Sequence, residues 1–181
     1  MHRFRTRIRP AIAALAVGVL LPLLPMGAVA APADKAHRAA NWEVSQLRDG
    51  RINNVQFGFT DWGLTIDTYL GLVAAGNRPA QARTVIRTVS ENVRKYVSYD
   101  GDFFAGAVAK ALLARRVAGK DASVEAANLN LRRKLASLVA PSGRVQDSGD
   151  TDFSNTISQS FSVLAFARSG ELPETVARFL L

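Results

Sequence analysis

Cysteine is absent from the 181-residue chain, and histidine occurs only twice, at His2 and His37. Without cysteine the fold contains no disulfide, so its stability must come from packing. A catalytic zinc site needs several histidine, cysteine or carboxylate ligands, and a Ser-His-Asp triad would depend on His37 alone. No Ser-x-x-Lys pair occurs either, which excludes the β-lactamase type of nucleophile. We therefore expect no metal and no cofactor.

The first thirty residues have the features of a signal peptide. Four arginines precede an apolar stretch at residues 11–24, and the small residues Ala28 and Ala30 follow it. The stretch is shorter than the roughly 20 apolar residues that span a bilayer, and Pro22 interrupts it. No adjacent pair of arginines precedes it, which argues against a twin-arginine signal. The sequence predicts secretion by the Sec route, with cleavage after Ala30.

The remaining chain, of about 150 residues, suits a single domain. We expect a short linker at residues 31–36 and one repeat domain at residues 37–181. Loss of the four N-terminal arginines halves the formal net charge of +8. The other basic residues are interleaved with acids and lack stacked aromatics, so we expect neither nucleic-acid binding nor a stable membrane span after cleavage. An excess of arginine over lysine and abundant alanine indicate a bacterial origin.

A pattern of paired helices recurs three times along this domain. Each unit has an amphipathic helix, a loop with an Asp-aromatic pair, and then a nearly uncharged helix that ends at a glycine. The Asp-aromatic pairs are Asp61-Trp62, Asp102-Phe103 and Asp152-Phe153, and the glycines are Gly76, Gly119 and Gly170. Alternation of half-exposed helices with helices that are apolar on several sides predicts an outer and an inner layer of α/α hairpins.

These loops, the helix ends and the motif at residues 143–147 resemble the prenyltransferase and squalene oxidase repeat proteins, in particular secreted bacterial members of unassigned function. The resemblance covers residues 37–181. It implies an all-α fold of the α/α-toroid type, in which inner helices surround a cavity. Residues 173–181 resemble the start of a fourth outer helix, so we expect about three and a half hairpins of an incomplete ring. The open edge of such a ring would allow self-association.

The motifs of enzymes with this fold are missing from the chain. Asp150-Thr151-Asp152 resembles the start of a terpene-cyclase acidic motif, but Phe153 and Ser154 replace the aspartates that should follow. We therefore predict a ligand-binding or cell-surface module, with a small apolar or amphipathic ligand and no catalytic residues. An isoprenoid cyclase, a prenyltransferase-like enzyme and an α/α-barrel glycoside hydrolase stay open as alternatives, with catalytic motifs outside this chain.

Polar residues near the inner helices are the candidates for a cavity or its rim. Asp61, Asp102 and Asp152 directly precede these helices, where carboxylates commonly accept backbone N–H bonds as N-caps. Asp67 falls within an apolar helix, so we expect it to line a cavity with a polar partner. The cluster around Asp150 lacks the spacing of an EF-hand, and no metal site is predicted. The remaining candidates are Trp62, Tyr69, Asn155 and Gln159.

Overall fold

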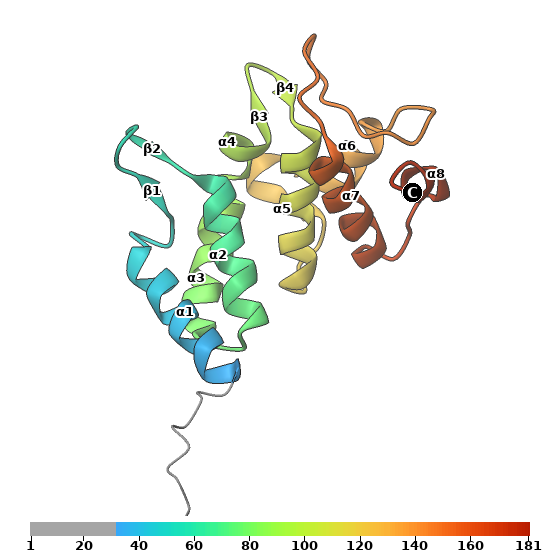
Figure 1. Cartoon of the computed structure of the whole chain (residues 1–181). Coiled ribbons are helices and arrows are strands. Elements are labelled where there is room, and N and C mark those ends of the chain that lie inside the picture. Colours follow the sequence, from blue (N-terminus) through green and yellow to red (C-terminus); the bar gives the residue numbers. More distant parts are fainter. Residues whose placement is uncertain (1–31) are drawn as a thin grey trace, which may run out of the picture.

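A computed structural model of the chain describes residues 32–181 (Figure 1). The predicted signal peptide at residues 1–30 and its cleavage site lie outside the described residues, as does Ala31. Eight α-helices, one 3₁₀-helix and three pairs of two-residue strands make up the regular structure of the described part. The prediction of an all-α protein is confirmed. The first helix already begins at Pro32, so residues 32–36 of the expected linker are helical.

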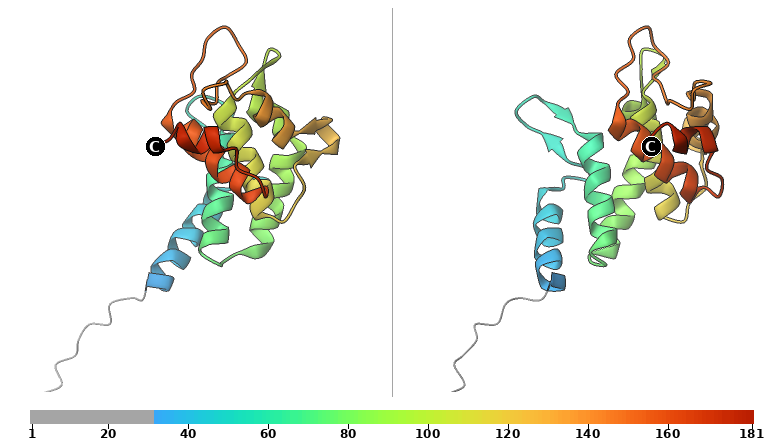
Figure 2. Two further views of the ribbon diagram at one scale, coloured as in Figure 1. Left: turned by 90° about the vertical axis from the view of Figure 1, so that its right-hand side faces the viewer. Right: turned by 45° about the vertical axis from the view of Figure 1, so that its right-hand side comes forward.

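The helices are α1 (Pro32–Gln46), α2 (Trp62–Ala74), α3 (Pro79–Glu91), α4 (Val93–Val97), α5 (Ala105–Val117), α6 (Leu131–Ser137), α7 (Thr156–Arg168) and α8 (Glu174–Arg178), with a 3₁₀-helix η1 at Glu125–Ala127. The antiparallel strand pairs are β1 (Asn53–Asn54) with β2 (Phe59–Thr60), β3 (Ser98–Tyr99) with β4 (Asp102–Phe103), and β5 (Ser123–Val124) with β6 (Leu129–Asn130). The first two pairs precede α2 and α5 directly. The β1–β2 and β3–β4 hairpins and the loop before α7 project from the same end of the molecule (Figures 1 and 2).

The helices form two packed layers. Helix α5 lies between α2 and α7, while α3 packs on α2, α4 and α6 pack on α5, and α8 packs on α7 (Figures 1 and 2). Helix α3 illustrates why one helix packs on the outside of another. Its residues Val85 and Val89 are buried on one side, and Arg83 and Arg87 are exposed on the other. An amphipathic helix can cover the core from outside because only one of its faces is apolar.

Helix α7 differs from the prediction that the nearly uncharged helices are buried on several sides. Its residues Ile157 and Leu164 are exposed, as is Leu64 on α2. The prediction is wrong for these faces, because one side of each helix has no neighbouring element among the described residues. Apolar composition indicates which helices reach the core, but it does not indicate how many of their faces are covered.

Candidate functional site

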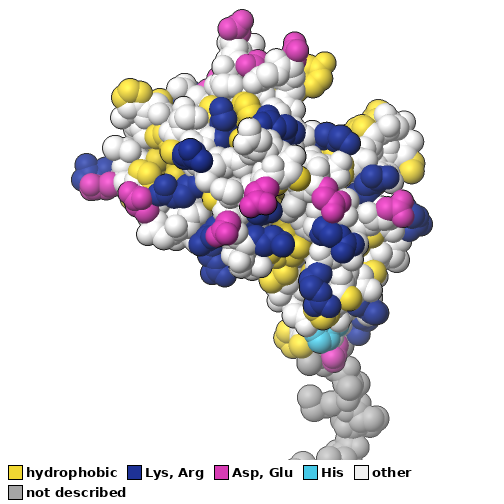
Figure 3. Space-filling model, turned by 180° about the vertical axis from the view of Figure 1, so that it is seen from behind, with side chains coloured by type: hydrophobic (Ala, Val, Ile, Leu, Met, Phe, Trp, Pro, Cys, Tyr) yellow, Lys and Arg dark blue, Asp and Glu magenta, His cyan; other side chains and the backbone are white. Residues whose placement is uncertain are grey.

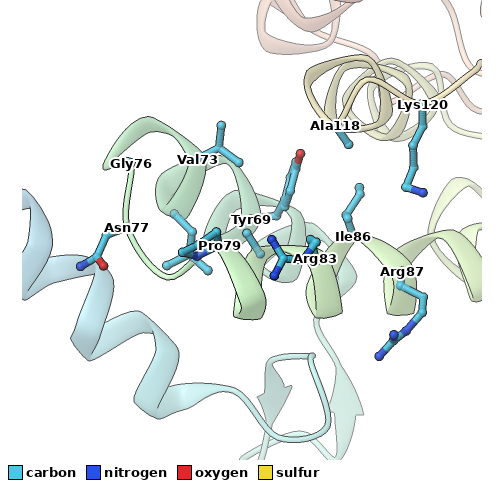
Figure 4. A pocket seen from close by; sticks show the side chains of 12 residues that line it. Tyr69, Val73, Gly76, Asn77, Pro79, Arg83, Ile86, Arg87, Ala118 and Lys120 are labelled. Carbon is cyan, nitrogen blue, oxygen red and sulfur yellow. The ribbon is translucent and has the colours of Figure 1, made fainter.

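A pocket of about 620 Å³ lies between α2, α3 and the C-terminal end of α5 (Figure 4). Ligand pockets typically fall in the range of about 300–1,000 Å³ and are lined mainly by apolar side chains. This pocket has that character. Its apolar and aromatic lining residues are Tyr69, Leu72, Val73, Pro79, Ala82, Ile86 and Ala118.

Local sequence explains why α2 and α3 form one side of the pocket. Helix α2 ends at Ala74 and is followed by Gly76, whose φ of +62° favours glycine. Pro79 begins α3 at a position that needs no N–H donor. The turn between them is short, so the last part of α2 and the first part of α3 lie side by side. On the opposite side α5 ends at Val117, and the small side chain of the next residue, Ala118, leaves the space between the helices unfilled.

Tyr69 contributes the pocket's aromatic side chain. It is buried on α2, and burial raises the pKa of its phenol above the ordinary value of 10.0. The phenol is therefore protonated at neutral pH and can donate a hydrogen bond. No hydrogen bond joins its hydroxyl to another described residue. Figure 4 shows this hydroxyl directed towards the end of α5 at Ala118.

Three cationic side chains border the pocket: Arg83 and Arg87 from α3, and Lys120 from the segment after α5. All three are exposed, and no carboxylate lines this pocket. Arg87 and Lys120 also line an adjacent, more polar pocket of about 450 Å³. Seen from behind, the molecule shows hydrophobic side chains bordered by lysine and arginine (Figure 3). The site thus combines an apolar interior with a positive edge.

The predicted rim carboxylates have structural partners. Asp61 caps α2, because its side chain accepts a hydrogen bond from the Leu64 N–H at 2.8 Å. This part of the capping prediction is confirmed. For Asp102 the prediction is wrong. The N-cap residue of α5 is Phe104, whose own side chain makes no hydrogen bond to the helix. Instead the carboxylate of Asp147, from the loop before α7, accepts the Ala105 N–H at 2.7 Å.

Capping is also wrong for Asp152, because Asn155 caps α7. The Asp152 carboxylate turns back into its own loop and lies 2.7 Å from the Arg144 guanidinium. Burial alone would raise the pKa of Asp152, but hydrogen bonds from Ser154 and Asp147 and the charge of Arg144 hold it below 3.8. Asp150 is exposed in the same loop. These carboxylates order the loop and do not converge on a cavity.

Asp67 lies on the face where α2 and α5 meet, and its partner is Lys110. The Lys110 ammonium is 2.6 Å from the Asp67 carboxylate, and it also lies over the Phe161 ring of α7, 5.5 Å from the centroid. The Lys110 side chain is only 12% exposed. The predicted polar partner of Asp67 is present, but the Asp67 side chain is 50% exposed and does not line the 620 Å³ pocket. The sequence itself marks Lys110 as a candidate partner of Asp67, because it is the first charged residue of an otherwise apolar stretch of α5.

Glu43 on α1 belongs to the same neighbourhood. Its carboxylate packs against Gly71 of α2, and its Oε2 atom has no hydrogen-bond partner among the described residues. Burial, and then the negative charge of Asp67, raise the pKa of Glu43 above 4.5. Nothing in the amphipathic pattern of α1 distinguishes Glu43 from a solvated surface residue, so the sequence analysis did not identify it.

Two other candidates are structural. Trp62 is part of the core. Gln159 is 3% exposed, accepts the Val145 N–H, and donates to the carbonyl oxygens of Gly143 and Val176. It lies with Asn155 beside a smaller pocket of about 270 Å³. Of the residues proposed for a cavity or rim, Tyr69 alone lines the 620 Å³ pocket.

Residues 32–181 contain no group of three or more histidine, aspartate or glutamate side chains placed to hold a metal ion. No helix within this range is long and apolar enough to cross a bilayer. Comparisons with protein-family models, with curated proteins and with solved structures find no match to this chain.

Proposed function

We propose that the protein is a binding module that holds a small, largely apolar ligand between α2, α3 and α5. The observation that carries the proposal is the 620 Å³ pocket, with its apolar lining and the single phenol of Tyr69. Apolar surface left in contact with water is unfavourable, and a ligand that covers it recovers that free energy. Tyr69 would orient the ligand by donating one hydrogen bond.

We also propose that the helix pairs belong to an α/α toroid related to the prenyltransferase and squalene oxidase repeat proteins. Support comes from the regular alternation of outer and inner helices and from the exposed apolar residues Leu64, Ile157 and Leu164 on inner helices. Self-association would cover such surface at the edge formed by α7 and α8, where Phe179 and Leu180 are also exposed. The rim carboxylates do not support the enzyme alternatives, because Asp61 caps α2 and Asp67 and Asp152 form ion pairs.

Export through the signal peptide is part of the proposal. The four arginines, the apolar stretch and Ala28 and Ala30 support it. N-terminal sequencing of protein from the culture medium should begin at Ala31. A chain that stays in the cytoplasm with Met1 intact would contradict secretion.

Filling the pocket tests the binding proposal. Val73 lines the pocket and is 42% exposed, so the substitution Val73→Trp should place an indole in the space without disturbing the core. Titration calorimetry with 1-decanol, an uncharged apolar probe, should show affinity reduced by about tenfold or more. The matched control is Leu164→Trp on α7, at a residue that is 53% exposed and away from the pocket.

The control variant should bind 1-decanol like the unmodified protein. Equal loss in both variants would indicate adsorption to general apolar surface. Unchanged affinity in Val73→Trp would place the probe elsewhere, and the proposed site would be wrong.

A further inference from the structure

The cations at the edge of the pocket narrow the class of ligand. Resting on the proposed binding function, we propose that the ligand is a free anionic amphiphile, with its apolar part in the 620 Å³ pocket and its carboxylate between Arg87 and Lys120. The binding function alone requires only apolar contact. The position of the cationic side chains Arg87 and Lys120 indicates that the ligand has an anionic head group.

Arg87 and Lys120 lie where two compartments meet. Both residues line the apolar pocket, and both line the adjacent polar pocket of about 450 Å³. They come from opposite sides, one from α3 and the other from the segment that follows α5 (Figure 4). The Arg87 guanidinium points away from Lys120 in Figure 4, so this exposed side chain would turn towards a head group bound beside Lys120. The head group would then have a cation on each side and polar space beyond it, while its hydrocarbon part stays among apolar side chains.

The cations at this junction have no ion-pair partner among the described residues. Within residues 32–181, neither Arg87 nor Lys120 forms an ion pair, and the same holds for Arg83, one turn before Arg87 on the same helix. The carboxylates of Glu91 and Asp121 line only the polar compartment. An anion placed between exposed cations gains charge-assisted hydrogen bonds, which are stronger than neutral ones.

Arg115 differs from these cations because its hydrogen bonds are already made. Its guanidinium donates to the carbonyl oxygens of Asp121 and Ser123 and to the Ser90 hydroxyl. It forms part of the polar compartment's wall and is not available to a head group without losing these bonds. With Arg115 excluded, the carboxylate is assigned to Arg87 and Lys120 because both line the apolar and the polar pocket.

A matched pair of probes separates the apolar and the charged contributions. Decanoate and 1-decanol have the same chain length and differ in charge, so their affinities can be compared by titration calorimetry. The unmodified protein should bind decanoate about tenfold more tightly than 1-decanol. In the double variant Arg87→Gln/Lys120→Gln this preference should disappear, while the affinity for 1-decanol stays the same.

The control variant Arg38→Gln/Arg133→Gln removes two exposed cations from α1 and α6, away from the pocket, and should keep the preference. If 1-decanol binds and decanoate binds no better, the head-group assignment is wrong and the binding function stands. A preference that survives in Arg87→Gln/Lys120→Gln also overturns the assignment. If neither probe binds, the binding function and the head-group assignment both fail. Sedimentation with phosphatidylglycerol vesicles without binding of free decanoate would indicate a membrane surface instead and would contradict the proposal.

Discussion

Helix α5 packs against its two neighbours, α2 and α7, in different ways. Against α7 the approach is close: a Cβ atom on Gly106 would lie 2.7 Å from the Ser158 hydroxyl and 3.4 Å from its Cα atom. Against α2 the helices separate towards the end of α5, and the 620 Å³ pocket opens there. Small residues let two backbones touch, whereas Tyr69 and Leu72 opposite Ala118 leave a space. One contact is suited to rigidity and the other to a ligand.

The polar contacts of the buried side chains also differ between the C-terminal and the N-terminal side of the molecule. On the C-terminal side, Gln159 and Asp147 bind backbone groups that are distant in sequence, and Asp152 pairs with Arg144. On the N-terminal side, Ala40 is the only buried residue of α1, and the nearby carboxylate of Glu43 is incompletely satisfied. Buried polar groups specify one arrangement of the chain because each unmatched group is costly. The C-terminal half is therefore expected to be the more rigid half.

The largest effect should come from Gln159→Leu, which breaks the polar contacts of the C-terminal side. The change leaves the buried Val145 N–H and the carbonyl oxygens of Gly143 and Val176 without their partner. Because each unmatched buried group costs about 1–3 kcal/mol, the free energy of unfolding should fall by about 3 kcal/mol or more. Urea unfolding followed by circular dichroism measures it.

Gln81→Leu on the half-buried surface of α3 is the control for Gln159→Leu, and its effect should be small. Equal effects at the two positions would show that the cost does not come from the lost hydrogen bonds of Gln159. The contrast between the two halves of the molecule would then lose its basis.

The second prediction compares two glycines at the same position of two inner helices. Gly106 is the second residue of α5 and Gly63 the second of α2. Gly106→Ala should reduce the free energy of unfolding by about 1–3 kcal/mol, because α5 and α7 must move apart. At Gly63 the nearest atom to an added Cβ is 3.4 Å away, so Gly63→Ala should be neutral or stabilising by up to about 1 kcal/mol. Thermal unfolding measures the stability of both variants. A larger loss of stability in Gly63→Ala than in Gly106→Ala would contradict the packing argument.

The smallest effects concern two carboxylates whose pKa values shift in opposite directions. The folded state lowers the pKa of Asp152 below 3.8, so its ion pair stabilises the fold at neutral pH and this contribution is lost as pH falls through the lowered pKa. Asp152→Asn should cost about 1 kcal/mol at neutral pH and nothing well below pH 3.8.

For Glu43 the sign is reversed. The folded state raises its pKa above 4.5, so the ionised carboxylate weakens the fold once pH exceeds that value. Glu43→Gln should therefore raise the unfolding temperature slightly at neutral pH and leave it unchanged below pH 4.5. Unfolding temperatures of both variants, measured as a function of pH, test these two predictions. If the change in unfolding temperature had the same sign and pH dependence in both variants, the opposite pKa shifts of Asp152 and Glu43 would be refuted.

The sequence alone determined the features that depend on neighbouring residues. The apolar stripe of α3 predicts a helix with one buried face, Gly76 and Pro79 mark the turn between α2 and α3, and Asp61 is correctly predicted as a cap. Such signals work because a helix repeats every 3.6 residues and a cap binds an N–H only three residues away. The helical class follows from these local rules.

The tertiary structure decided everything that joins distant segments. Asp147 binds the first N–H of α5 across 42 positions, although Asp102 is much closer in sequence. The pocket exists because α5 ends beside the α2–α3 turn, and Arg87 and Lys120 line it from separate elements. No periodicity encodes these approaches, since they depend on how side-chain volumes fill the space between helices after the chain has packed.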